Sequence, residues 1–361
     1  MPELTELIQL SRFAGERFDL IQAKAGNSSL KVNDETLLIK QSGLELSEIH
    51  SEDQLCEVTV SKLLQFIAEN ENVEEDRSTD SLDRAAHDCL IAACRTKGRL
   101  PSNETFLHAL LGPLTLHTHP PVVTSIVCQR GWREKISGII PDAIFVDYHT
   151  PGIRAAIATK AVLEQRDWKK GDEAIIFMQN HGLVVCGGSA GDVANKTNEV
   201  VAKLSYFLGV DWSRYRLSNR ISDLILSTTG DMVCSYLSED TVLLDAVRRN
   251  TSCLLAQPVF PDQVIYSGPA GLELTSFDDE KPLINYIERY GQLPRIVVYK
   301  ASSNNLFIVA ENMHRCREIE EVLKAHVLTL TSASMPNVQF LSDDELIYLM
   351  DWDSEKNKET V

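Results

Sequence analysis

Two histidines separated by one residue are the strongest sign of chemistry in this chain. His117 and His119 lie in an apolar and β-branched run, residues 114–120, that predicts a strand ending at Pro120. Side chains along a strand alternate between its two faces, so both imidazoles point the same way. Folding does not require two imidazoles side by side on a strand face. The pair therefore predicts two ligands of one metal ion.

A third ligand is expected at His181. This residue stands in a turn between two apolar runs, 174–178 and 183–186, and we expect the adjacent Gly182 to supply a positive φ there. Three histidines without a cysteine ligand are typical of a catalytic zinc site, which keeps one position for substrate. Another divalent transition metal fits the same donors. Taken alone, a histidine in a turn is more often a hydrogen-bonded structural residue.

Hydrophobic periodicity predicts the elements that position these residues. Strands are expected up to residue 32 and over 36–40, 114–120, 143–148, 174–178 and 183–186. Helices are expected over 1–24, 58–68, 82–97, 105–111, 154–164 and 190–208. The acidic run 69–80 predicts an exposed loop. Later in the chain, two strands flank a hairpin turn at 302–305, and a helix follows over 312–330.

Length and composition narrow the function further. The 361 residues suggest about two domains, and 43% hydrophobic with 24% charged residues is ordinary for a soluble globular protein. A net charge of −17 argues against nucleic acid or an anionic membrane as partner. The apolar runs are too short for a membrane helix, and the N-terminus lacks the pattern of a secretion signal. We therefore expect a cytoplasmic protein whose eight scattered cysteines are free thiols.

Five short motifs, read in order, resemble those of the class II aldolase/adducin family over roughly residues 5–210. They are Gly-Asn-Ser-Ser at 26–29, Lys-Gln-Ser-Gly at 40–43, Pro-Ser-Asn-Glu at 101–104, His-Thr-His-Pro at 117–120 and Asn-His-Gly at 180–182. Four segments most resemble the aldolase half of rhamnulose-phosphate aldolase/lactaldehyde dehydrogenase fusion proteins: residues 38–43, 104–108, 260–265 and 345–352. No G-x-G-x-x-G motif occurs, so no nicotinamide cofactor is expected.

The resemblance implies a fold and an assembly. The expected fold is α/β, with a layered α-β-α catalytic domain around a central, mainly antiparallel sheet over residues 1–215. A smaller α+β domain is expected over 221–361, where it would cover the site or mediate assembly. A homo-oligomer is implied as well, since related proteins are tetramers.

The resemblance also implies roles for individual residues. His117, His119 and His181 would hold Zn²⁺, and Glu104 would be the general base. The residues implied to bind the phosphate of a substrate are Asn27, Lys40, Ser42, Gly43, Ser102 and Asn103. Tyr148 and His149 are candidate proton donors. Plainer readings exist: turn chemistry explains the small residues at 26–29 and 42–43, and a carboxylate at 104 suits a helix start capped by Ser102.

The implied activity is that of a Zn²⁺-dependent lyase, an aldolase that cleaves a ketose phosphate or a related phosphorylated sugar or sugar acid through an enediolate. Decarboxylases, 4-epimerases and dehydratases of the family share the three histidines and remain alternatives. A non-catalytic, adducin-like interaction module is a further alternative, although such modules lack the histidines. Ser102-Asn103 stands where the fuculose enzymes have paired serines, which leaves open a different anion.

Overall fold

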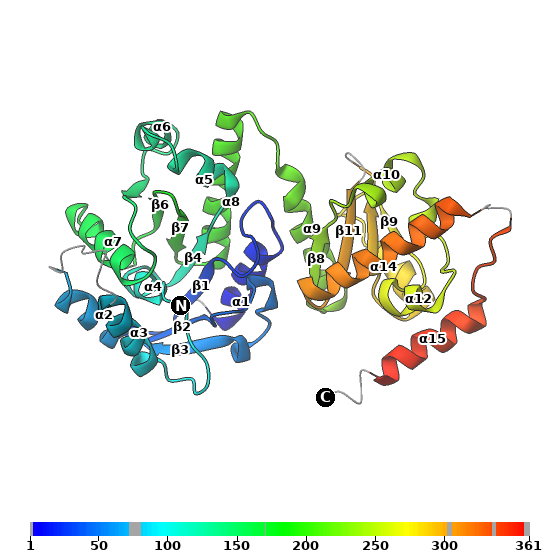
Figure 1. Ribbon diagram of the computed structural model, residues 1–361, viewed down its shortest axis with the longest axis horizontal. Helices are drawn as coiled ribbons and strands as arrows, with labels where there is room; N and C mark the ends of the chain where they lie inside the picture. Colours follow the sequence, from blue (N-terminus) through cyan, green and yellow to red (C-terminus); the bar gives the residue numbers. More distant parts are fainter. Residues whose placement is uncertain (1–2, 72–80, 170, 302–304, 334–336, 357–361) are drawn as a thin grey trace. The chain divides into compact units, whose positions relative to one another are not determined.

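The computed structural model describes residues 3–71, 81–169, 171–301, 305–333 and 337–356 (Figure 1). The chain divides into two compact units, Met1–Ser213 and Arg214–Val361. Most of the predicted acidic loop at 69–80 and of the predicted turn at 302–305 lies outside the described residues.

The described part of unit 1 is built on a seven-stranded sheet with the order β3-β2-β1-β4-β7-β6-β5. Its strands are β1 (Asn27–Lys31), β2 (Thr36–Lys40), β3 (Leu55–Thr59), β4 (Leu114–Thr118), β5 (Ile144–Val146), β6 (Ala174–Met178) and β7 (Gly182–Gly187). Neighbouring strands are antiparallel except β5 and β6, which are parallel. The expected central, mainly antiparallel sheet is therefore confirmed.

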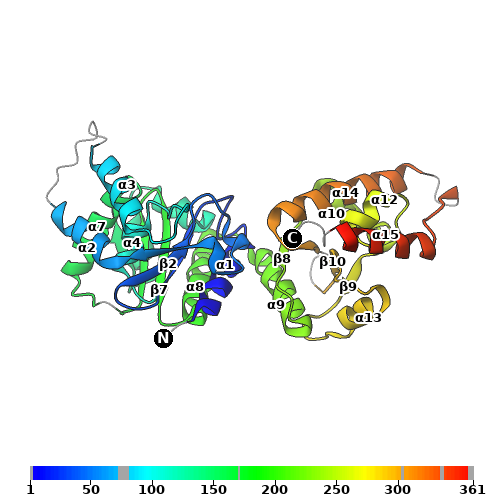
Figure 2. The ribbon, with the colours of Figure 1, turned by 90° about the horizontal axis from the view of Figure 1, so that it is seen from below.

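Helices cover both faces of this sheet (Figures 1 and 2). One face carries α1 (Leu4–Gly15), α5 (Pro121–Val127), α6 (Trp132–Ser137) and α8 (Ala190–Leu208). The other carries α2 (Val60–Glu69), α3 (Ser81–Ala93), α4 (Thr105–Leu110) and α7 (Ile153–Gln165). In β7, Leu183 and Val185 join the first apolar cluster, whereas Val184 and Cys186 join the second. This alternation along a strand buried on both faces produces the expected α-β-α layers.

Several sequence expectations were wrong at element boundaries; the helix expected over 82–97, for example, ends at Ala93, and the strand expected over 143–148 covers only Ile144–Val146. The helix expected over 1–24 ends at Gly15, where a Cβ would lie 2.1 Å from the backbone nitrogen of Ser47. The chain then turns through Ala23 and Gly26, which both have positive φ. The helix expected from residue 58 starts at Val60, because Leu55–Thr59 pair with β2 as a buried edge strand.

Unit 2 is an α+β unit, as expected. Its described strands form a sheet of order β8-β11-β10-β9: β8 (Cys234–Leu237), β9 (Leu272–Leu274), β10 (Ile296–Tyr299) and β11 (Asn305–Ala310). Its helices are α9 (Leu217–Thr229), α10 (Thr241–Arg249), α11 (Ser252–Leu255), α12 (Pro261–Ser267), α13 (Lys281–Tyr290), α14 (Met313–Ser332) and α15 (Asp343–Lys356). The long helix α14 packs its apolar side against this sheet. In the described residues of both units, no helix has the length and apolarity needed to cross a membrane.

Candidate active site

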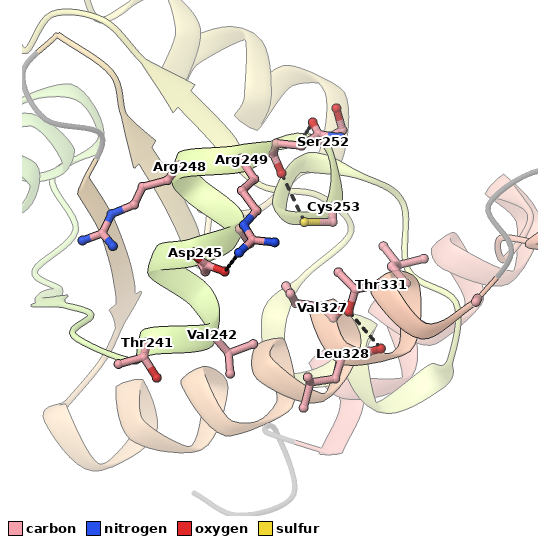
Figure 3. A pocket seen from close by; sticks show the side chains of 14 residues that line it. Thr241, Val242, Asp245, Arg248, Arg249, Ser252, Cys253, Val327, Leu328 and Thr331 are labelled. Carbon is pink, nitrogen blue, oxygen red and sulfur yellow. Dashed lines mark hydrogen bonds and ion pairs between the residues drawn. The ribbon is translucent and has the colours of Figure 1, made fainter.

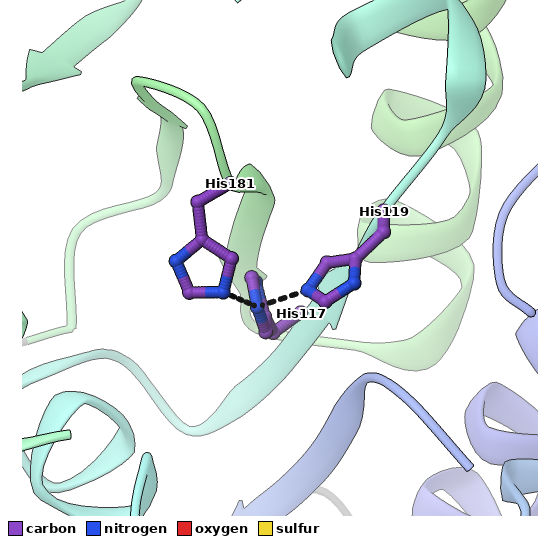
Figure 4. A group of neighbouring side chains, drawn as sticks. All are labelled: His117, His119 and His181. Carbon is purple, nitrogen blue, oxygen red and sulfur yellow. Dashed lines mark hydrogen bonds between the residues drawn. The ribbon is translucent and has the colours of Figure 1, made fainter. Parts of the chain in front are cut away.

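Three histidines converge at one end of the unit 1 sheet. His117 lies near the end of β4, His119 follows that strand, and His181 immediately precedes β7, the antiparallel neighbour of β4. The Nε2 atom of His117 lies 2.9 Å from Nε2 of His119 and 3.2 Å from Nε2 of His181 (Figure 4). This is the one group in the described residues whose His, Cys or carboxylate side chains could together hold a metal ion.

Gly182 is needed here for space. A Cβ at this position would lie 2.4 Å from the carbonyl oxygen of Thr118 and 2.7 Å from Cδ2 of His119. The positive φ expected at Gly182 instead falls on Asn180, at 51°. That expectation was wrong, because the left-handed residue of the turn comes before His181 and not after it. The glycine allows β7 to approach the end of β4 closely, which brings the three rings together.

The imidazole of His117 is fully buried and oriented by the backbone. Its Nδ1 lies 3.1 Å from the carbonyl oxygen of Leu183, which can only accept, so Nδ1 carries the proton of a neutral ring. The lone pair of Nε2 is then free to face the other two histidines. A backbone carbonyl bound to the second nitrogen is the usual partner of a metal-ligating histidine. Burial, followed by the charges of His117 and His181, lowers the pKa of His119 to about 3. The residues present therefore fit a Zn²⁺ ion held by three imidazoles.

Glu104 lies beside this cluster, one residue before α4. Its Oε1 is 3.1 Å from Nε2 of His181 and 3.4 Å from Nε2 of His117, while Oε2 accepts a hydrogen bond of 2.6 Å from the side-chain amide of Asn27. Burial acts to raise the pKa of Glu104, but the charge and hydrogen bond of His117, together with those of His181, hold it well below its usual range. The same carboxylate outweighs burial at His117 and raises the pKa of that imidazole.

The cap of α4 differs from the expected one. Glu104 itself occupies the cap position, two residues after Ser102. The Ser102 hydroxyl accepts a 3.3 Å hydrogen bond from the Glu104 backbone N–H. Ser102 therefore shapes the turn that leads into the helix.

A cavity of about 230 Å³ opens beside Glu104 and brings most of the predicted residues together. The predicted residues that line it are Asn27, Lys40, Ser42, Gly43, Ser102, Asn103, Glu104, His119 and His181. Lys24 and Pro151 also line it and were not predicted; the place of Lys24 just before the Gly-Asn turn was an available signal. Tyr148 and His149 do not line this cavity. The Tyr148 side chain is 46% exposed, and His149 lines a separate cavity next to β5.

Lys40 gives the cavity a buried cation. Only 2% of the residue is exposed, and its Nζ donates to the carbonyl oxygens of Leu44, at 2.6 Å, and Lys24, at 3.3 Å. Burial lowers the pKa of Lys40 to about 8, and nearby carboxylates, Glu48 first, offset part of that effect. An amine held this way can bind an anion as a protonated donor or release its proton near pH 8.

Unit 2 contains a larger cavity of about 790 Å³ among α10, α11 and α14 (Figure 3). Apolar side chains such as Val242, Val327 and Leu328 line much of it. Arg249 turns toward Asp245, with which it forms an ion pair of 3.0 Å (Figure 3). Size alone therefore does not mark the candidate active site.

Three solved structures are similar to part of this chain. The N-terminal class II aldolase domain of a conserved protein from Thermoplasma acidophilum is 24% identical, with a TM-score of 0.48, over 57% of this chain and 93% of that chain. YgbL from Klebsiella pneumoniae is 20% identical, with a TM-score of 0.40, over 57% of this chain and 87% of its own. It is described as an aldolase, epimerase or decarboxylase. L-fuculose-1-phosphate aldolase from Thermus thermophilus is 14% identical, with a TM-score of 0.35, over 56% of this chain and 92% of its own.

Comparison of the sequence with curated proteins finds no match. The family model of the class II aldolase and adducin N-terminal domain, in contrast, matches residues 5–205, more than half of the 361 residues. This chain therefore belongs to the class II aldolase and adducin family.

Proposed function

We propose that this protein is a Zn²⁺-dependent lyase that cleaves a carbon–carbon bond of a ketose phosphate or a related phosphorylated sugar. The observation that carries the proposal is the position of Glu104, whose Oε1 lies within 3.4 Å of two of three converging imidazole Nε2 atoms at the edge of a cavity. A carboxylate beside three such nitrogens suits proton transfer at a metal centre. The sequence at residues 38–43, which resembles the aldolase half of the dehydrogenase fusion proteins, also supports an aldolase.

The three imidazoles would hold the metal through Nε2. When bound, Zn²⁺ supplies a Lewis acid that stabilises negative charge on substrate oxygens. The histidines must be neutral to act as ligands, which removes the two charges that lower the pKa of Glu104. The charge of the bound Zn²⁺ would take their place and keep the pKa of this carboxyl low, so Glu104 would have to move away from the metal to accept a proton. Asn27 holds Oε2, so Oε1 is the oxygen placed to accept a proton from a substrate hydroxyl.

The same cavity offers an anion site. Lys40, Ser42, Ser102 and Asn103 line it, and each of them carries a side-chain donor. In a protein with a net charge of −17, an anionic substrate needs such a local set of polar donors and lysines. We therefore propose that these residues, with Asn27 and the backbone of Gly43, bind the phosphate of a sugar or sugar acid.

The screening experiment separates the reactions that could share this site. Zn²⁺-loaded protein is incubated with ketose phosphates and phosphorylated sugar acids, and aldol products and CO₂ are both measured. Release of dihydroxyacetone phosphate or another small phosphate supports the lyase. CO₂ without an aldol product would replace it with a decarboxylase. Absence of any product from protein that has bound Zn²⁺ would reject the lyase and favour an interaction module.

Two further parts of the proposal have separate tests. We propose a homo-oligomer, and light scattering of the full chain measures its mass. The proton-donor role of Tyr148 and His149 also stays a proposal. Tyr148→Phe and His149→Gln should each slow turnover if that role is correct, and unchanged rates in both variants would remove it.

A further inference from the structure

One face of β1 carries three polar side chains at alternate positions, Asn27, Ser29 and Lys31. Each of them bonds to α4 or to a residue at one of its ends. Asn27 donates to Glu104 at 2.6 Å, and the Ser29 hydroxyl lies 2.7 Å from Nδ1 of His108. Lys31 extends the series toward the end of the helix.

The Lys31 ammonium group donates to the carbonyl oxygens of Ala109, at 2.7 Å, and Leu111, at 2.5 Å. Carbonyls at the end of a helix lack partners within it and carry partial negative charge, so a buried ammonium there is well placed. Lys31 is buried, as are Ser29 and His108. The three contacts together form a β1–α4 ladder, defined by the pairs Asn27–Glu104, Ser29–His108 and Lys31–Ala109/Leu111.

The spacing of the ladder matches the geometry of its two elements. Two residues of a strand advance about 6.6 Å, and four residues of a helix advance about 6 Å. The distance from Asn27 to Ser29 along the strand therefore nearly equals the distance from Glu104 to His108 along the helix. The six residues of α4 are too few to be stable as an isolated helix, so tertiary contacts must fix its position.

We propose that Ser29, His108 and Lys31 are positioning residues that set the place of α4 along β1, and thereby the place of the Glu104 carboxylate beside the histidines. This inference rests on the proposed role of Glu104 as the base. A slip of α4 by about 1 Å would alter both distances from Oε1 to the imidazole nitrogens, and displacements of that size can cost about 100-fold in rate. None of the three residues lines the cavity, so they act through Glu104.

The strand supplies a matched control. Ser28 is the neighbour of Ser29, is equally buried, and faces the other side, where its Oγ lies 2.7 Å from Oγ of Ser11. Ser28→Ala and Ser29→Ala therefore remove the same hydroxyl from the same strand and break contacts of the same length. Only Ser29→Ala breaks a contact with α4.

Both variants of the full chain are assayed with L-fuculose 1-phosphate and the other ketose phosphates of the screen. We expect Ser29→Ala to lower kcat about 10-fold with KM within about twofold, and Ser28→Ala to leave both within twofold. Visible absorption of the Co²⁺-loaded protein is the second measurement, because it reports the surroundings of the metal without substrate. It should change in Ser29→Ala and match wild type in Ser28→Ala. Amide hydrogen exchange in α4 should be faster only in Ser29→Ala.

His108→Asn keeps a planar side chain that fits within the space of the imidazole and shortens its reach to the Ser29 hydroxyl; it should behave as Ser29→Ala does, which covers the case that one variant fails to fold. Equal kcat, spectra and exchange in Ser28→Ala and Ser29→Ala would overturn the positioning role. Failure of the proposed function looks different: wild-type protein would then cleave no sugar phosphate, while the Co²⁺ spectra and the exchange rates would still support or reject the ladder.

Discussion

The two units of this protein contain cavities of opposite character. The cavity of unit 1 measures about 230 Å³ and is lined by a carboxylate, two lysines, two histidines and small polar residues. The cavity of unit 2 measures about 790 Å³ and has mainly apolar walls with an ion pair between Arg249 and Asp245. The smaller cavity contains the groups that can transfer protons and hold a metal. Converging donors therefore locate the chemistry better than volume does.

The difference follows from where the side chains originate. The residues of the unit 1 site come from strand ends and the turns beside them: β1 and β4 end or begin there, and His181 directly precedes β7. Side chains at these points extend past the strands and meet at one end of the sheet. The walls of the unit 2 cavity come from the sides of helices, where apolar residues face one another. Such a surface can bury a ligand but has few groups that can react with it.

The sharpest test of this contrast is removal of one metal ligand. His117→Ala should lower Zn²⁺ affinity at least ~100-fold and abolish product release, because two imidazoles and a carboxylate cannot replace the buried third ligand. Elemental analysis of purified protein and competition with a chelator measure the change. The control is His326→Ala in unit 2, where burial lowers the pKa of another fully buried histidine to about 4. Loss of Zn²⁺ in both variants would contradict the assignment.

The second largest effect is expected at the base. Glu104→Gln keeps the shape of the side chain and an oxygen for the Asn27 amide, but it cannot accept a proton at Oε1. We expect kcat to fall about 10²- to 10⁴-fold while Zn²⁺ stays bound. The matched change in unit 2 is Glu320→Gln, a partly buried carboxyl whose pKa is raised by burial. Turnover by Glu104→Gln at the wild-type rate would show that another group is the base.

Sequence reasoning predicted much of unit 1 because local rules apply there. The same-face placement of His117 and His119 follows from strand alternation, and an apolar run on either side of the turn placed His181 near them. The edge strand β3 was missed because Leu55–Thr59 is short and runs directly into α2, so its pattern merged with that of the helix. Leu55–Thr59 is a strand because it pairs with β2. That pairing is not visible in the local hydrophobic pattern.

The shape of the cavity could not be predicted from local rules. It depends on contacts between distant segments, such as the hydrogen bond from the Ser42 N–H to the Leu100 carbonyl, which joins the turn after β2 to the segment that precedes α4. Lys24 and Pro151 line the same cavity although they are far apart in the sequence. The close approach at Gly182 is also invisible in sequence, since a glycine in a turn more often signals a positive φ than a lack of space. The sequence therefore predicted which residue types line the site but not the distances between them.

A smaller, pH-dependent effect is expected at Lys40. Its pKa in the fold is about 8, below its ordinary value of 10.5, so it loses its charge as the pH rises through 8. KM for the phosphorylated substrate should therefore increase several-fold between pH 7 and 9, and Lys40→Arg should flatten this increase because arginine stays charged.

Stability gives an independent check on Lys40. Because the folded pKa is the lower one, the fold disfavours the charged amine. The cost is full below pH 8 and fades as the pH rises toward 10.5. Lys40→Met should thus raise the melting temperature at pH 7 while it weakens substrate binding. The unit 2 control is Lys324→Met, which removes an ion pair with Asp240 and should leave KM unchanged. A lower melting temperature in Lys40→Met would show that its charge stabilises the fold.

The smallest effect is expected in the larger cavity. Leu328 lines that cavity and is 46% exposed, so Leu328→Asp adds a charge there without burying it. Zn²⁺ content and kcat should stay within twofold of wild type, and the melting temperature should change little, as for most exposed positions. Ala25→Asp makes the comparable change in the small cavity, where a new carboxylate repels an anionic substrate and should raise KM. If Leu328→Asp raised KM as strongly as Ala25→Asp, the two cavities would be functionally coupled and the apolar one would belong to the catalytic machinery.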